Sequence, residues 1–194
     1  AHLHIHSVLS PCADLEMAPA AIVQKAVEKG LDIIALTDHN SLSNTAVCRR
    51  AAEKAGLAFI AGAEVQTAEE IHVVCLFPDD ETAAAFHERL YDALPDMPNN
   101  PDFFGDQPIL DDDNGIIRFE EKALINSVVW DLVETARQVE EFGGWCFPAH
   151  VDHYANSVLA QLGFVPVDPK VDALGLTAGC KLQEFCEQHP GIER

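Results

Sequence analysis

The sequence predicts an α/β protein built on a parallel sheet or barrel, and three observations support this class. Short apolar segments that suit strands alternate with amphipathic segments that suit helices. Helical segments begin at proline or a capping residue and end at glycine. Polar residues follow directly after strand segments, where parallel sheets and barrels gather their functional groups. With 194 residues, 48% of them apolar, we expect one domain over residues 1–194.

The alternation is clearest in the first half of the chain. Residues 1–6 suit an opening strand, and residues 19–30 have proline at the start, glycine at the end and apolar residues at helical spacing. A buried strand over 31–37 is followed by a capped helix over 41–56 and a further strand over 57–65. This βαβαβ order is typical of a parallel sheet or barrel.

A short connection follows the strand over 57–65. Only eight residues lead from Glu64 to His72, and a helical crossover needs about 10–12 or more. The strand over 71–77 should therefore return antiparallel to the strand before it. This geometry places His72 near Glu64.

The second half of the chain has a polar interruption. Residues 94–115 are rich in proline, asparagine and aspartate, and we interpret them as a surface excursion that follows a helix over about 79–93. The other expected elements are a helix over 124–142, a strand over 145–151, a short helix over 155–162, a strand over 172–177 and a helix over 179–188.

Composition limits the partners and the cellular setting. The formal net charge is −20, from 32 acidic and 12 basic residues, and such a surface repels a polyphosphate backbone, so we expect no duplex nucleic acid as a partner. An anionic substrate would need a local positive centre, which bound divalent cations could supply. No apolar run approaches the roughly 18 residues of a membrane span, and six cysteines without a C-x-x-C pair suit a reduced, cytoplasmic setting. The oligomeric state stays open.

Three histidines alternate with apolar residues at the start of the chain. In a strand, His2, His4 and His6 would share one face, because successive side chains point to opposite faces. Same-face neighbours lie roughly 6–7 Å apart, and a zinc–imidazole bond is about 2 Å long, so two such rings can bind one ion. The alternatives are a tag remnant or a solvated strand edge.

Further candidate ligands follow three of the expected strands. They are Asp38, His39, Glu64, His150, Asp152 and His153. Each position alone has a structural explanation, but together they should arrive at one rim of the sheet. Histidine and carboxylate ligands without paired cysteines suit borderline divalent ions such as zinc, manganese or iron(II).

The ordered motifs "HLHIHS", "LTDHN", "GAEV", "IHVVCLF" and "PAHVDH" resemble the polymerase and histidinol phosphatase (PHP) family of metal-dependent phosphoesterases. This resemblance covers nearly the whole chain. It implies a distorted (β/α)₇ barrel that holds up to three divalent ions, zinc, manganese or iron, at its carboxyl-end rim.

The resemblance also implies roles for individual residues. His4 and His6 correspond to ligands of the first ion, and Glu64 to a carboxylate that bridges the first and second ions. His72 and His150 correspond to ligands of the second ion.

The third ion and the supporting residues come from the same motifs. His39 resembles a ligand of the third ion, with Asp14 as the expected companion and Cys12 as the alternative. Asp38 is expected to fix the orientation of an imidazole, and together with His153 it is our candidate for catalytic support.

Some positions depart from the family pattern. The family usually has aspartate where this chain has His2, and close relatives often have arginine where it has His153. The final D-x-H motif, which completes the first and third metal sites, is absent before Arg194, and the chain begins at Ala1, so we expect that both ends are cut.

The expected function is hydrolysis of a phosphoester by a metal-activated hydroxide. The expected substrates are a small phosphorylated metabolite, a nucleotide or a short oligonucleotide end. The alternatives are a polymerase-associated PHP nuclease module and a non-catalytic metal-binding or scaffold domain.

Overall fold

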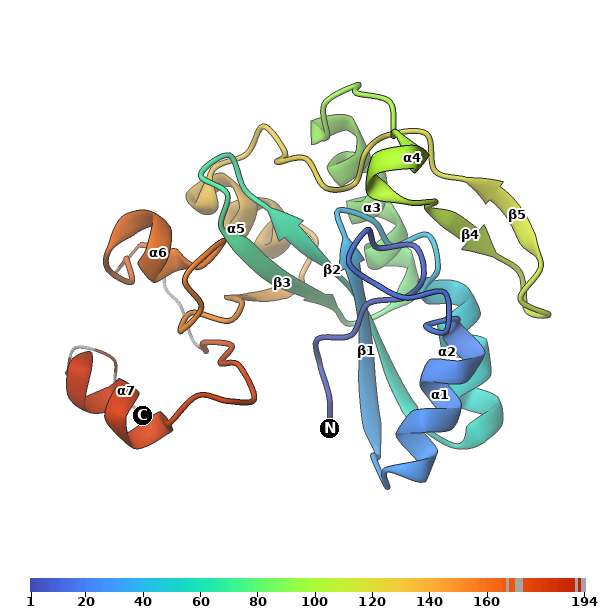
Figure 1. Cartoon of the computed structure of the whole chain (residues 1–194), viewed down its shortest axis with the longest axis horizontal. Helices are drawn as coiled ribbons and strands as arrows, with labels where there is room; N and C mark the ends of the chain where they lie inside the picture. Colours follow the sequence, from blue (N-terminus) through green and yellow to red (C-terminus); the bar gives the residue numbers. More distant parts are fainter. Residues whose placement is uncertain (167, 170–172, 191, 193–194) are drawn as a thin grey trace.

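The computed structural model describes residues 1–166, 168–169, 173–190 and 192. A four-stranded sheet with the order β1-β2-β3-β6 lies at its centre (Figure 1). The strands are β1 (Ile33–His39), β2 (Ala58–Gln66), β3 (His72–Phe77) and β6 (Trp145–Pro148). Strand β1 pairs with β2 in parallel, whereas β3 is antiparallel to both β2 and β6. The predicted antiparallel return of β3 is confirmed, and β1, β2 and β6 run in one direction.

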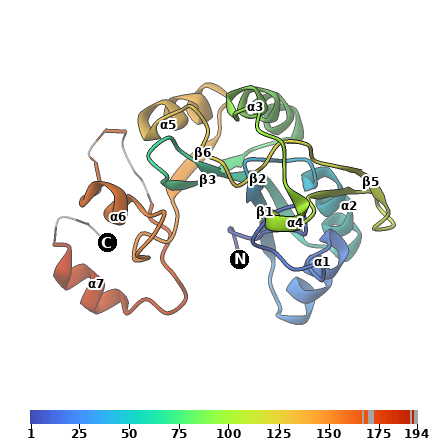
Figure 2. The ribbon, with the colours of Figure 1, turned by 45° about the horizontal axis from the view of Figure 1, so that its top comes forward.

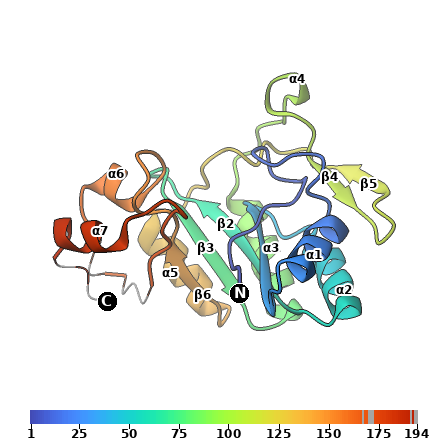
Figure 3. The ribbon, with the colours of Figure 1, turned by 60° about the horizontal axis from the view of Figure 1, so that its bottom comes forward.

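Helices line one side of this sheet (Figure 2). The helix α2 (Thr45–Ala55) packs on β1 and β2, α3 (Asp80–Ala93) on β2 and β3, and α5 (Leu132–Glu141) on β6, while α1 (Pro19–Glu28) packs against α2. Two short helices, α6 (Val158–Leu162) and α7 (Leu182–Gln188), lie beyond β6, at the other side of the molecule from α1 and α2 (Figure 3).

Local sequence signals set the helix ends. Pro19 occupies the first turn of α1, where a missing N–H costs nothing. The side chain of Asp79 accepts a hydrogen bond from the amide of Thr82 at the start of α3, as expected of an N-cap. Helix α2 ends at Gly56, whose φ of 74° is a left-handed conformation that glycine adopts readily.

The strands bury side chains on both faces. In β3, Val73, Cys75 and Phe77 belong to the large core that includes the helices, whereas Val74 and Leu76 belong to a small cluster on the opposite face. This period of two is the normal alternation of a strand. We call the face that carries Val74 and Leu76 the inner face of the sheet.

The structure does not confirm the expected (β/α)₇ barrel, because no closed barrel is found among the described residues. The opening segment lies beside β1 but makes only an isolated bridge, between His2 and Ile34, so the expected strand over 1–6 is wrong. In the expected strand over 172–177, residue 172 lies outside the described residues. Residues 173–177 are not a strand, although Gly175 exchanges two backbone hydrogen bonds with the end of β6. Both flanks of the sheet therefore have too few ladder hydrogen bonds to form further strands.

Other boundaries also differ from expectation. The helix expected over 124–142 begins only at Leu132, because Asp131 caps it there by accepting a hydrogen bond from the amide of Glu134. The helix expected over 155–162 begins at Val158, after Ser157 caps it in the same way.

The expected surface excursion contains short regular elements. They are α4 (Pro101–Phe104) and β4 (Pro108–Leu110), and β4 pairs antiparallel with β5 (Ile116–Phe119). Residues 107–110 are buried, whereas 111–119 are exposed, so the segment is anchored through β4. Among the described residues, none of the helices is both long and apolar enough to cross a bilayer.

Candidate metal centre

One buried carboxylate lies at the centre of the candidate site. Glu64, near the end of β2, is 2% exposed. Its carboxylate oxygens lie within 3.4 Å of nitrogen atoms from five imidazoles. The distances are 2.9 Å to His4 Nε2, 3.1 Å to His6 Nε2, 3.3 Å to His39 Nδ1, 3.3 Å to His72 Nδ1 and 3.4 Å to His150 Nε2. The structure thus brings together the histidines that the sequence placed at this rim.

Strand direction and alternation explain this convergence. The carboxyl ends of β1 and β2 carry His39 and Glu64, which are register partners. Because β3 runs the opposite way, its first residue, His72, arrives at the same edge, beside Gln66 of β2. His150 follows β6 with a φ of 31°, a backbone conformation that residues other than glycine rarely adopt. This turn ends the alternation of β6 at the point where the imidazole meets Glu64.

The packing of the nitrogen atoms fits a bound cation. His4 Nε2 lies 3.0 Å from His6 Nε2, and His72 Nδ1 lies 3.1 Å from His150 Nε2. Two imidazoles whose lone pairs face each other at such distances repel unless a proton or a metal ion lies between them. Glu64 Oε1 and His39 Nδ1 are also buried without a hydrogen-bond partner among the described residues.

Among the described residues, three overlapping groups have the composition of a metal site, and within each group the ligand atoms lie within 4.8 Å of one another. Two of them share Glu64, namely His4 with His6 and Glu64, and His39 with Glu64 and His72, and the third is His6 with Cys12 and His39. Imidazole and carboxylate ligands suit zinc, manganese or iron(II). The residues present therefore fit divalent ions that share Glu64.

The charge states of Glu64 and His39 suit a metal, whereas that of His6 depends on whether an ion is bound. Burial would raise the pKa of Glu64, but hydrogen bonds from surrounding histidines hold the pKa well below its usual value, so the carboxylate is ionised. Burial lowers the pKa of His39 to about 3, so its imidazole is neutral. Burial also opposes a charge on His6, but hydrogen bonds with Cys12 and Glu64 outweigh it and raise the pKa to about 10. Because a metal binds neutral imidazole, His6 would release a proton when an ion binds.

Asp38 supports the site from behind. Alternation along β1 turns it away from the inner face, and it is fully buried. Ser10 Oγ donates a hydrogen bond to Asp38 Oδ1 at 2.7 Å and lies 3.1 Å from His6 Nδ1. Since the single Ser10 proton goes to Asp38, His6 Nδ1–H must donate to Ser10, which leaves Nε2 free to face Glu64. The expected orienting role of Asp38 thus has a geometry that supports it, with Ser10 between the two groups.

Two supporting residues were missed by sequence reasoning. One is Ser10. The other is Gln66, because its Oε1 lies 3.0 Å from His72 Nε2 and can accept a hydrogen bond from that nitrogen. That hydrogen bond directs His72 Nδ1 toward Glu64. Gln66 lies two residues beyond Glu64 and so shares its strand face, which was a usable signal. Nothing in the local sequence marked Ser10.

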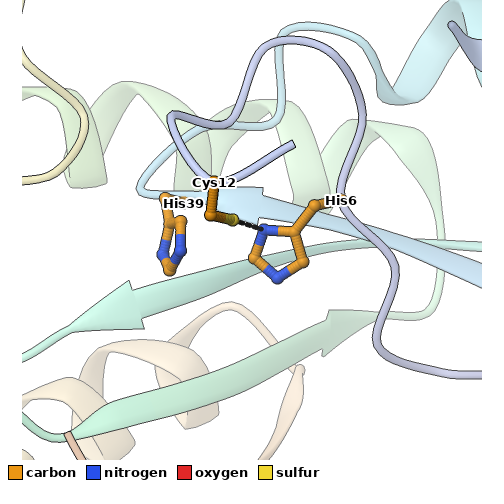
Figure 4. A group of neighbouring side chains, drawn as sticks. All are labelled: His6, Cys12 and His39. Carbon is orange, nitrogen blue, oxygen red and sulfur yellow. Dashed lines mark hydrogen bonds between the residues drawn. The ribbon is translucent and has the colours of Figure 1, made fainter. Parts of the chain in front are cut away.

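The loop residues expected near the third ion are separated. Asp14 is exposed and does not belong to any of the candidate ligand groups among the described residues, and its expected pairing with His39 stays a prediction. Cys12, the alternative, has its Sγ 3.5 Å from His6 Nδ1 (Figure 4). Cys12 and Asp14 are both exposed, but the loop brings the Cys12 thiol within 4.8 Å of ligand nitrogens of His6 and His39.

His153 and His2 lie at the margin of the site. The His153 ring centroid is 5.7 Å from that of His150, and its Nδ1 contacts the Ala155 carbonyl instead of Glu64. His2 is exposed and lines a cavity of 760 Å³ that is also lined by His4, His6 and Cys12. The opposite wall of this cavity belongs to α1. The candidate metal centre is therefore open to molecules from solvent.

These features define a candidate metal site on an α/β sheet, in which several histidines surround one buried carboxylate. The sequence profile of the PHP domain family matches residues 2–138, and this chain belongs to that family. The resemblance inferred from the motifs is confirmed.

Curated relatives match shorter stretches. The chain is 34% identical over 77 residues to a 5'-3' exoribonuclease of Haemophilus influenzae, which covers 38% of this chain and 27% of that protein. It is 42% identical over 65 residues to an error-prone DNA polymerase of Nocardia farcinica, covering 34% of this chain and 6% of the polymerase. The chain thus spans only a minor part of these relatives.

Solved structures share the fold. Endonuclease Q of Pyrococcus furiosus, a lesion-specific endonuclease, superposes with a TM-score of 0.62 at 21% identity, covering 98% of this chain and 45% of that chain. A protein of Bifidobacterium adolescentis described as a metal-dependent phosphoesterase has a TM-score of 0.58 at 17% identity, covering 97% and 83%. Both neighbours bear the names of enzymes that hydrolyse phosphate esters.

The expectation of no duplex nucleic acid is corrected by a further structure. Endonuclease Q in complex with a 27-mer duplex that has an abasic lesion at the active site matches with a TM-score of 0.56 and 20% identity, covering 89% of this chain and 40% of that chain. A protein with this fold therefore can hold duplex DNA. The net charge of −20 was a poor guide, because local charge at a metal site decides whether a polyanion can approach it.

Proposed function

We propose that this chain hydrolyses phosphate esters at the Glu64 cluster in a metal-dependent reaction. The observation that carries the proposal is the approach of five imidazole nitrogens to within 3.4 Å of one buried carboxylate. Burying one carboxylate and several imidazoles together costs free energy unless they are paired or bind a cation. Divalent ions would offset this cost, because each of these side chains could act as a metal ligand.

The proposed ligands divide into two sets that share Glu64. His4 and His6 together with Glu64 would hold the first ion, and His72 and His150 together with Glu64 would hold the second. Zinc, manganese or iron bound there would supply an activated hydroxide and would neutralise the charge of the phosphate oxygens.

The protein residues orient the ligands and the substrate. Asp38 through Ser10 holds His6, and Gln66 holds His72, so that one nitrogen of each ring points toward Glu64. Neither a serine nor a cysteine nucleophile is required. His153, at the margin of the site, is placed to donate a hydrogen bond to the part of the substrate that projects from the cluster.

We propose nucleic acid as the substrate class. The exoribonuclease, the polymerase and endonuclease Q are all named for action on nucleic acids, and they support this choice over a metabolite. The 760 Å³ cavity that His4 and His6 line is also lined by Lys25 of α1 and by Lys29 just after that helix, and both lysines can contact a phosphate backbone although the chain is acidic overall.

Chelation tests the metal requirement. EDTA should abolish hydrolysis of a phosphodiester-linked oligonucleotide, and manganese or zinc should restore it. Activity that survives rigorous chelation would contradict the proposal. The double variant Lys25→Ala/Lys29→Ala should raise KM for the oligonucleotide and reduce its salt dependence, while Lys54→Ala on α2 serves as a matched surface control.

A second candidate is hydrolysis of a small phosphorylated molecule, for which the cavity of 760 Å³ beside His4 and His6 has room. The Bifidobacterium structure, described as a metal-dependent phosphoesterase, is compatible with it. A panel that compares phosphomonoesters with oligonucleotides separates the two. Stoichiometric metal with no turnover on either would favour a non-catalytic metal-binding domain.

A further inference from the structure

We infer that Tyr154 is a stacking site for an unpaired nucleobase beside the candidate metal centre. The inference rests on the proposed function for the phosphate that the cluster would hold, and it names the part of the substrate that projects from the cluster. The contact itself is argued from the residues that follow β6.

Tyr154 has an aromatic ring that lies almost wholly in water. The residue is 87% exposed, the largest exposed fraction among the large hydrophobic side chains that the structure describes. Its free face can take a flat ligand, because aromatic rings stack well on one another. Single exposed apolar residues are common on protein surfaces and carry no function by themselves. The neighbours of Tyr154 distinguish it from such residues.

A series of rings connects Tyr154 to the candidate metal centre. The centroid of its ring lies 4.3 Å from that of His153 at an interplanar angle of 34°, and the His153 centroid lies 5.7 Å from that of His150. One nucleotide of a strand spans about 3.4 Å along a duplex. A base within about three nucleotides of a phosphate held beside His150 can therefore reach the Tyr154 ring.

The turn that carries Tyr154 is held in place before a ligand binds. The amide of His153 donates a hydrogen bond to the carbonyl of His150 at 2.8 Å. On the other side of Tyr154, the carbonyl of Asn156 accepts a hydrogen bond from the amide of His72 at 2.9 Å, which ties the turn to β3. A ring on such a turn loses little conformational freedom when a base stacks on it.

The cavity beside Tyr154 favours an uncharged group over a phosphate. It has a volume of 600 Å³, within the usual range of small-molecule sites, and its lining includes Asp152, Lys181 and Glu184. Lys181 pairs with Glu184 at 3.1 Å, which offsets the positive charge. The Asp152 carboxylate accepts a hydrogen bond from the amide of Thr177 at 2.8 Å and keeps its negative charge in the cavity wall. An uncharged base avoids the repulsion that a phosphate would meet there.

Stacking on Tyr154 defines which nucleic acids suit the site. Every base has a π face, so the contact tolerates any sequence. Bases inside a duplex are already stacked on their neighbours, so the site selects a single-stranded segment or an unpaired base. This role differs from that of Lys25 and Lys29, which can contact the phosphate backbone at the other cavity.

2-Aminopurine provides a direct readout, because the fluorescence of this base falls when it stacks on an aromatic ring. Single-stranded oligonucleotides with phosphorothioate linkages, which resist hydrolysis, would carry it at successive positions. Manganese-loaded wild-type protein should quench it at one position or at two neighbouring positions. Tyr154→Ala should remove this quenching and weaken binding by about 5- to 100-fold, the effect expected for one lost stacking contact. Tyr154→Phe should retain both.

Phe103→Ala is the matched control, because Phe103 is 78% exposed on α4 and lies outside the turn that carries Tyr154. It should quench and bind like the wild type. With hydrolysable oligonucleotides, Tyr154→Ala should raise KM and leave kcat unchanged, as expected for lost substrate binding. An abasic residue at the quenched position should remove the difference in KM between Tyr154→Ala and the wild type.

Two results would overturn the inference: quenching that persists in folded Tyr154→Ala, or equal quenching at every position of the oligonucleotide. Because quenching is measured without turnover, the proposed function is tested separately. Hydrolysis of oligonucleotides without quenching by Tyr154 would leave the proposed function standing and remove the stacking site. Quenching that depends on Tyr154, in a protein that hydrolyses none of the oligonucleotides, would have the opposite meaning.

Discussion

The rim of the sheet around Glu64 and the region beyond β6 use similar residue types in opposite environments. At the rim, His39 and Glu64 are 5% and 2% exposed, and they lie between strands with continuous ladders. Beyond β6, Tyr154 is 87% exposed next to His153, and the segment 173–177 is not a strand. Histidine becomes a candidate ligand where the sheet removes it from water and places it near a carboxylate. His150 lies at the junction of the two regions.

The largest expected effect is at the centre of the rim. Glu64→Gln removes the shared anion, and we expect loss of most bound metal and a fall in activity of more than about 100-fold, beyond the effect of losing a supporting residue. Metal analysis and steady-state kinetics measure this. Glu53→Gln on the exposed side of α2 is the control and should behave like the wild type. Full metal content in Glu64→Gln would contradict the central role of Glu64, and with it the contrast between the rim and the region beyond β6.

Asp38→Asn tests whether the rim depends on support from behind. The amide oxygen can still accept from the Ser7 amide and the Ser10 hydroxyl, but the amide NH2 cannot accept from the Ser7 hydroxyl, and the charge that favours donation by His6 through Ser10 is lost. We expect metal affinity to fall about 10–100-fold with the fold retained, measured by competition with a chelator. Asp32→Asn, exposed just before β1, is the matched control. Equal affinities for the two variants would contradict the orienting role.

Gly62→Ala tests the packing of the sheet that carries the rim. An added Cβ would lie 2.5 Å from the Cys75 carbonyl oxygen and 2.9 Å from Leu76 Cδ2. Because backbone cannot move easily inside the sheet, we expect a loss of about 1–3 kcal/mol in the free energy of unfolding. Denaturant titration measures it, and Gly179→Ala, where an added Cβ meets nothing within 4 Å, is the control. Equal free energies of unfolding for the two variants would contradict the tighter packing of the sheet relative to the region beyond β6.

Thr177→Val gives the smallest expected effect. Thr177 donates hydrogen bonds to the Asp152 carboxylate from both its amide and its hydroxyl, and the substitution removes only the hydroxyl donor. We expect a stability change of about 0.5–1.5 kcal/mol and little change in metal content, measured by thermal unfolding and metal analysis. A large loss of metal would show that the region beyond β6 positions His150 more strongly than its exposure suggests.

Much of the sheet could be predicted because its signals are local. The eight residues from Glu64 to His72 are too few for a crossover, and that length alone predicts the antiparallel β3 and its arrival beside Glu64. Apolar alternation predicts which strand positions face the site. The sequence predicts the start of the helix over 124–142 too early, because the apolar residues before Asp131 suit a packed loop as well as a helix. Trp130 is buried in the core just before the cap at Asp131.

The supporting and loop residues could not be predicted in the same way. Loops have no period, so the sequence favoured Asp14 over Cys12 on chemistry alone, whereas the loop brings the Cys12 thiol within 4.8 Å of ligand nitrogens of His6 and His39. Ser10 acts between Asp38 and His6, across a separation of 28 residues from Asp38. Such contacts depend on how the loop packs on β1. The single-domain extent over 1–194 stays a prediction.

The sequence by itself determined the class of residues at the rim, the order of strands that carry them and the family to which the chain belongs, because strand period and connection length are short-range properties. Only the tertiary structure decided that the strands among the described residues form no closed barrel, that the Cys12 thiol lies beside His6 and His39, and that Ser10 lies between Asp38 and His6. These depend on contacts between distant segments, whose free energies are decided by packing and hydrogen-bond geometry rather than by local pattern.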